Sequence, residues 1–190
     1  MTSLTPDHAP FARNRHVDAQ ANQMTLPTRV FISYARGPRD NEVLKLARRL
    51  RADGFHVALD QFEIGTPELG WQLWMERNIE EADFVLLVCD GVYHRRFQAR
   101  ERPGVGAGAT FEGAVLIRQD LYDSIARISK YYPVVLDERN VRYIPKLLRR
   151  ATRFVLPAEY KQLVRAITKQ RTAVHEPTDC PADVDGPWLY

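Results

Sequence analysis

The residues of this chain that could do chemistry stand directly after its apolar runs. The polar segment 33–36 (SYAR), Asp60 and Asp90 each follow such a run. A phosphoacceptor site would need an acidic pair after the first run, an Asp after the third and a Lys after the fifth. Asp90 meets the second condition, but 33–36 holds no acidic pair and 154–157 holds no Lys. The pattern therefore argues against phosphoacceptor chemistry.

Other chemistries leave only weak signals. Gly104, Gly106 and Gly108 share some spacing with the dinucleotide-binding fingerprint, but they stand far beyond the third run. No Ser, His and acidic residue form a nucleophile elbow, and the five histidines lack the spacing of a metal site. Glu112 lies in the first turn of an expected helix. A carboxylate there complements the helix dipole, which contributes under about 1 kcal/mol, and this alone explains the presence of a Glu. The residues alone therefore identify no reaction.

These residues are positioned by apolar runs that alternate with segments of helical periodicity. The runs predict five strands, at 29–34, 55–59, 84–89, 131–136 and 153–156. The most apolar run, FVLLVC at 84–89, is expected to be central and buried on both faces. Helices are expected to begin at Asp40, near Trp71, at Thr110 with a break near 123–124, at Pro145 and at Pro157. The segment 94–109, rich in Arg and Gly, is predicted to be a long loop.

The alternation of strands and helices predicts an α/β fold. Right-handed crossovers then give a five-stranded parallel sheet with helices on both faces. At this length the natural strand order is the flavodoxin-like 2-1-3-4-5, which places the first and third strands beside the switch point. Ligands bind there, beyond the carboxyl ends of the strands. We expect the site to gather 33–37, 60–71, 90–95 and the start of the helix near 110.

Composition favours one globular domain at 29–171, between polar tails at 1–28 and 172–190. The chain is 45% apolar and 27% charged, and its net charge of +3 does not argue for nucleic acid. Two cysteines make no disulfide framework, which favours a reducing compartment. The N-terminus lacks the apolar core of a signal peptide, and no apolar run is long enough to span a membrane. We expect a cytoplasmic protein without a membrane or nucleic-acid partner.

Four segments in chain order resemble the SEFIR family, whose domains are relatives of the Toll/interleukin receptor (TIR) domains. They are ISYAR at 32–36, LDQFEIG at 59–65, WMERNIEEADFVLLVCDGVYHRR at 74–96 and TFEGAVLIRQDLYD at 110–123. The similarity runs from about Val30 to about Gln170. The family fold is a flavodoxin-like sheet, in agreement with the fold that the strand and helix pattern predicts.

The resemblance implies two functions. Many bacterial and plant TIR domains, and some relatives, hydrolyse NAD at the nicotinamide–ribose bond. The bacterial proteins often serve as toxic anti-phage effectors that are activated by self-assembly. Our leading hypothesis is this NAD glycohydrolase activity, with NAD as substrate and no cofactor. The alternative is a non-catalytic adaptor that binds a second SEFIR or TIR domain through the 61–70 loop. A third possibility is a transferase of similar fold that acts on another N-glycosidic bond.

The resemblance also assigns roles to residues. The catalytic Glu of the TIR enzymes matches Glu112, whose carboxylate would stabilise the oxocarbenium character of the ribose as its bond to nicotinamide breaks. Residues expected to line the substrate are Ser33, Tyr34, Ala35, Arg36, Asp60, Phe62, Trp71, Trp74 and Tyr93. If these residues do not bind substrate, Arg36 would instead form a surface ion pair and Asp60 would be a turn residue. One of the two tryptophans would then simply belong to the core. Many TIR enzymes have a Trp four residues before the Glu; here Gly108 stands there, so Phe111 or Tyr93 would form that wall.

Overall fold

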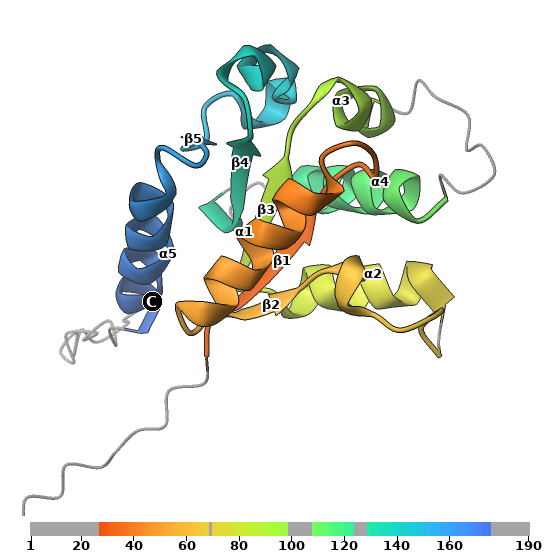
Figure 1. Ribbon diagram of the computed structural model, residues 1–190, viewed down its shortest axis with the longest axis horizontal. Helices are drawn as coiled ribbons and strands as arrows, with labels where there is room; N and C mark the ends of the chain where they lie inside the picture. The colour runs from red at the N-terminus through yellow and green to blue at the C-terminus, as the bar shows by residue number, and fades with distance from the viewer. Residues whose placement is uncertain (1–26, 69, 99–107, 124–128, 176–190) are drawn as a thin grey trace, which may run out of the picture.

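A five-stranded parallel sheet forms the centre of the protein, in the order β2-β1-β3-β4-β5 (Figure 1). The computed structural model describes residues 27–68, 70–98, 108–123 and 129–175. Its strands are β1 (Arg29–Ser33), β2 (His56–Ala58), β3 (Phe84–Val88), β4 (Tyr131–Val135) and β5 (Phe154–Val155). Its α-helices are α1 (Asp40–Ala52), α2 (Gly70–Glu81), α3 (Gly91–Phe97), α4 (Gly108–Asp123) and α5 (Tyr160–His175). The predicted flavodoxin-like strand order is confirmed.

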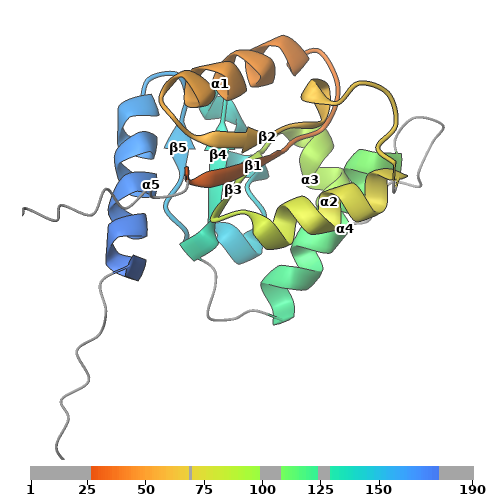
Figure 2. The ribbon, with the colours of Figure 1, turned by 90° about the horizontal axis from the view of Figure 1, so that it is seen from below.

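Helices cover both faces of the sheet. Figure 2 shows α1 and α5 against one face, and α2, α3 and α4 against the other. Two separate apolar cores result, one between the sheet and the α1–α5 layer and one between the sheet and the α2–α4 layer. Each strand contributes to both cores, because successive side chains along a strand point to opposite faces.

The central strand β3 explains why the sheet is parallel and enclosed. All five of its residues are buried, and it pairs in parallel with β1 on one side and β4 on the other. A strand covered on both faces by helices is expected to be a continuous apolar run. The prediction made from the run at 84–89 is confirmed.

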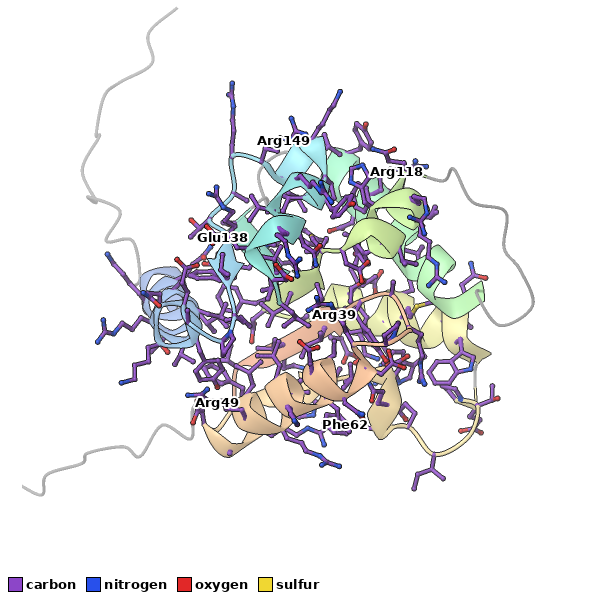
Figure 3. The ribbon with its side chains drawn as sticks, turned by 45° about the horizontal axis from the view of Figure 1, so that its top comes forward. Arg39, Arg49, Phe62, Arg118, Glu138 and Arg149 are labelled. Atoms are coloured by element: carbon purple, nitrogen blue, oxygen red, sulfur yellow. The ribbon has the colours of Figure 1, made fainter. Side chains whose placement is uncertain are left out.

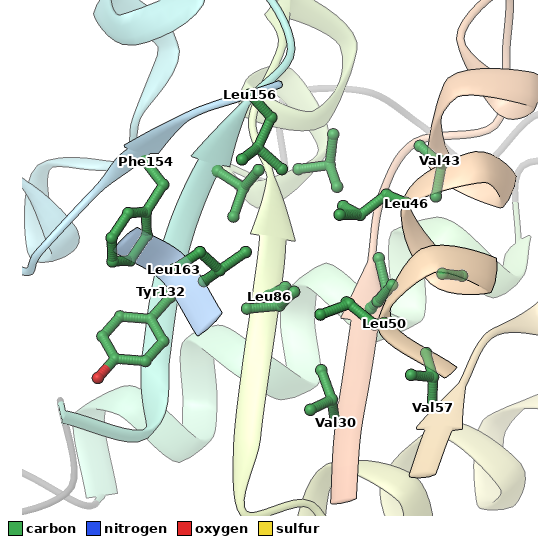
Figure 4. Packing of buried hydrophobic residues seen from close by; sticks show 14 of the residues in the cluster. Val30, Val43, Leu46, Leu50, Val57, Leu86, Tyr132, Phe154, Leu156 and Leu163 are labelled. Carbon is green, nitrogen blue, oxygen red and sulfur yellow. The ribbon is translucent and has the colours of Figure 1, made fainter. Parts of the chain in front are cut away.

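The helix α1 closes its side of the sheet with one apolar face. Val43, Leu46 and Leu50 recur at three- and four-residue intervals and are buried against the sheet. Figure 4 shows Leu46 and Leu50 directed at the strands, with Leu50 close to Val30 of β1. Gly54, at φ +90°, follows the helix in the left-handed conformation that often ends one.

The prediction of a continuous loop over 94–109 is wrong, because α3 begins directly after β3. The Asp90 carboxylate accepts a hydrogen bond of 2.7 Å from the Tyr93 backbone N–H and so caps this helix. Tyr93 and Phe97, one helical turn apart, are both buried. Basic residues between them obscured the apolar spacing. The helix α4 also begins earlier than expected, at Gly108, and residues 99–107 lie outside the described part.

The second half of the chain follows the expected pattern more closely. The helix α4 ends at Asp123, where a break was predicted, and Ile117 and Leu121 on its core face are buried. The predicted basic helix after Pro145 is a single 3-10 turn, η4 (Lys146–Leu148), preceded by another 3-10 segment, η3 (Glu138–Tyr143). No helix in the described ranges combines the length and the apolar character needed to cross a bilayer.

Replacing Leu163 by Ala should lower the free energy of unfolding by about 2–5 kcal/mol, because it opens a cavity between α5 and the sheet. Leu163 is fully buried, whereas Leu73 on α2 is 51% exposed. The same change at Leu73 is the matched control and should cost less than about 0.5 kcal/mol. Urea unfolding followed by circular dichroism measures both, and equal losses would contradict the packing described.

Candidate functional site

The carboxyl end of β1 divides the predicted site residues between two sides of the sheet. Ser33 points into the α2–α4 layer, where its hydroxyl shares a hydrogen bond of 3.0 Å with the Tyr93 hydroxyl. Ala35 belongs to the same core. Tyr34 points the other way and packs in the core beneath α1. Residues adjacent in the sequence therefore face different surroundings.

On the α1 side, two predicted ligand contacts bind each other. Arg36 Nε donates to Asp60 Oδ2 over 2.8 Å. Asp60 begins the 3-10 turn η1 (Asp60–Phe62) directly after β2. The next residue, Gln61, donates from its side-chain amide to the Asp40 carbonyl over 3.1 Å and so ties this turn to the start of α1. The ion pair expected for Arg36 in the absence of a phosphate is thus the one that forms.

Two polar atoms beside this ion pair are buried without a hydrogen bond. They are the Tyr34 hydroxyl and Asp60 Oδ1. Tyr34 is only 7% exposed, and its burial, followed by the neighbouring Asp60 carboxylate, raises its pKa above the ordinary value, so the hydroxyl stays protonated. The carboxylate and hydroxyl lie near each other but lack the geometry of a bond. Either atom would gain a hydrogen bond if a water, an ion or a ligand reached it.

Phe62 lies at the outer edge of this side. The Arg51 guanidinium lies over its ring, with the central carbon 3.4 Å from the ring centroid. Arg51 also donates to the Val57 carbonyl over 2.7 Å, which holds the guanidinium in place at the end of α1. One face of the Phe62 ring is therefore occupied by a side chain of the protein itself.

On the opposite side, Tyr93 is fully buried. Burial raises the pKa of its hydroxyl, which is neutral and bonded to Ser33. Cys89 is buried in the same core, and burial likewise raises its thiol pKa, which leaves it unreactive. In this structure Tyr93 is a part of the core and offers no open ring face.

The tryptophans of α2 form an aromatic series beside β1. Trp74 packs edge-to-face on Phe31 of β1, with 5.9 Å between ring centroids. Trp71 packs edge-to-face on Trp74 in turn, at 5.7 Å. Both tryptophans are only partly buried. They join the core to the surface at the start of α2, where the 61–70 loop ends.

Glu112 is the fifth residue of α4. The structure describes its backbone but not its side chain. The helix packs against α2 and α3 and contacts β1, so its layer is the one that holds Ser33 and the tryptophans (Figure 2). Tyr34, Arg36 and Asp60 belong to the other side of the strand.

Sequence reasoning missed two grooves away from the end of β1. One, the α1–α5 groove, measures about 220 Å³ and is bordered by Lys45, Leu46, Leu156 and Tyr160. The other, the α3–α4 groove, measures about 320 Å³ and is bordered by Phe97, Arg118, Tyr122, Lys146 and Leu147. The basic run starting at residue 146 was the signal for the second. Within the described ranges, no three His, Cys, Asp or Glu side chains are placed to hold a metal ion.

Changing Tyr34 to Phe should leave the free energy of unfolding unchanged or raise it by up to about 1 kcal/mol, because it removes a buried hydroxyl that has no partner. The matched control is Tyr160→Phe. The Tyr160 hydroxyl donates to Asp53 over 2.6 Å, so its loss should cost about 1 kcal/mol. Urea unfolding compares the two, and a larger loss for Tyr34→Phe than for Tyr160→Phe would contradict this assignment.

Comparison with known proteins identifies the family of this chain. A family model described as the SEFIR domain matches residues 28–167. A similar solved structure is the crystal structure of a prokaryotic SEFIR domain, at 26% identity, with 84% of this chain and 99% of that chain covered and a TM-score of 0.49. A search of curated proteins finds no match. The matched range begins one residue before β1 and ends within α5. Because it spans all five strands and well over half of the sequence, the chain belongs to the SEFIR domain family.

Proposed function

We propose that this chain is an NAD glycohydrolase that releases nicotinamide from NAD and leaves ADP-ribose. The observation that carries the proposal is the packing of α4, the helix of Glu112, against β1 and against α2 with its tryptophans. This packing brings a helix that carries a glutamate, from far along the sequence, into contact with the first strand. Resemblance to NAD-cleaving TIR domains supports the same assignment.

The reaction asks little of the protein beyond one carboxylate. The bond between ribose C1′ and the nicotinamide nitrogen breaks, and its electron pair neutralises the pyridinium, so no strong general acid is needed. The Glu112 carboxylate stabilises the positive charge that develops on the ribose. Water then adds at C1′ and loses its proton to the carboxylate or to solvent. NAD is the substrate, and no cofactor takes part.

The two sides of β1 suggest how an extended substrate is held. NAD is long enough to pass around the end of the strand, with its nicotinamide ribose on the α4 side. The Tyr34 hydroxyl and Asp60 Oδ1 then offer a donor and an acceptor to another polar part of the molecule. Arg36, already neutralised by Asp60, orients that carboxylate.

Self-assembly is part of the proposal, through the 61–70 loop. Ile64 on this loop is completely exposed, so its side chain would add buried apolar area to a contact between molecules. The same observation favours the second candidate function, an adaptor that binds another SEFIR or TIR domain without catalysis. We propose that the enzyme acts in the bacterial cytoplasm, in defence against phage.

Glu112→Gln should reduce nicotinamide release from NAD by at least about 100-fold, because it removes the charge that stabilises the transition state. Glu76→Gln, the same change at an exposed position of α2, is the control and should keep full activity. Nicotinamide is measured by chromatography over a series of protein concentrations, because a site completed by assembly gives activity that rises faster than linearly. Equal activity of the wild-type and Glu112→Gln proteins would refute the catalytic role. An inactive wild-type protein that still self-associates would favour the adaptor.

A further inference from the structure

The 61–70 loop carries an apolar side chain between two carboxylates. Ile64 is 102% exposed, and no described part of the protein covers it. Glu63 and Glu68 on either side are exposed and form no salt bridge in the described ranges, although Glu63 interacts electrostatically with Arg51. A surface that would bind this loop needs an apolar depression with cations at its border.

The α3–α4 groove has these properties. Two of the large apolar side chains that remain exposed, Tyr122 at 58% and Leu147 at 39%, border it. Arg118 and Lys146 border it as well, and neither has a salt bridge to another side chain that the structure describes. None of the lining residues is acidic. The groove thus complements the loop in both polarity and charge.

The loop cannot enter the groove of its own chain. Figure 3 shows Phe62, near the start of the 61–70 loop, and Arg118, on the groove, on opposite sides of the protein. The apolar tip and its receptor are therefore available to each other only between molecules. Because they are different surfaces, the contact would be heterologous, and repeating it generates a ring or an open chain of copies.

We propose that Ile64 of one copy inserts into the α3–α4 groove of a second copy, between Tyr122 and Leu147. Glu63 and Glu68 then approach Arg118 and Lys146, which favours encounter in one orientation and weakens the contact as the salt concentration rises. This inference deepens the proposed function, on which it rests for the role of assembly. The contact itself does not require NAD or Glu112.

The test uses two variants that each damage one half of the contact. Ile64→Asp disrupts the loop surface and keeps the groove intact. Lys146→Glu combined with Leu147→Asp disrupts the groove and keeps the loop intact. All three positions are exposed, so the fold should survive. Leu73→Asp, at a 51% exposed position outside both surfaces, is the control. Light scattering after gel filtration, without NAD, gives the molar mass across protein concentrations.

The wild-type, Leu73→Asp and Glu112→Gln proteins should form species larger than a dimer as concentration rises. Each damaged variant alone should remain a monomer. An equimolar mixture of the two should give dimers and nothing larger, because only one intact loop and one intact groove can then meet. A groove variant that assembles like the wild type, or a mixture that stays monomeric, would overturn the inference. Intact assembly of an inactive protein would instead count against the proposed catalysis alone.

Discussion

The parallel pairing of β1 between β2 and β3 is the constraint on which the rest of the structure depends. It holds Val30 opposite Val57 on one side and Phe84 on the other. The pairing sets the alternation of side chains along the strand, so Ser33 and Tyr34 leave the sheet in opposite directions. Each neighbouring helix layer then receives one half of the segment that the sequence marks as a site.

The two halves differ in chemical state. On the α2–α4 side the polar groups are satisfied, because the Ser33 and Tyr93 hydroxyls bond each other in a closed core. On the α1 side the Arg36–Asp60 ion pair leaves Asp60 Oδ1 and the neighbouring Tyr34 hydroxyl buried without partners. A buried polar group that lacks a hydrogen bond within the protein reduces stability unless a water, an ion or a ligand satisfies it. The unsatisfied polar groups thus lie beside α1, and the backbone of Glu112 lies on α4, across the strand from them.

The fold was predictable from the sequence because five apolar runs alternate with amphipathic segments, and strand order follows from chain length and right-handed crossovers. The helix α3 was missed because it is short and basic, although Asp90 offered a capping signal. The site was predictable only as a region. Arg36 and Asp60 are 24 residues apart, and their bond depends on the register of β1 and β2, which no local pattern specifies. The groove between α3 and α4 depends on tertiary packing, so only its basic residues were visible in the sequence.

Hydrogen exchange tests most directly the claim that NAD binds around the end of β1. The Glu112→Gln protein, saturated with NAD, provides a complex that does not turn over. The account predicts slower exchange at amides 33–37, at the η1 turn and in the first turns of α4, with no change at the ends of β4 and β5. Protection confined to β4, β5 and the start of α5, around the α1–α5 groove, would contradict it.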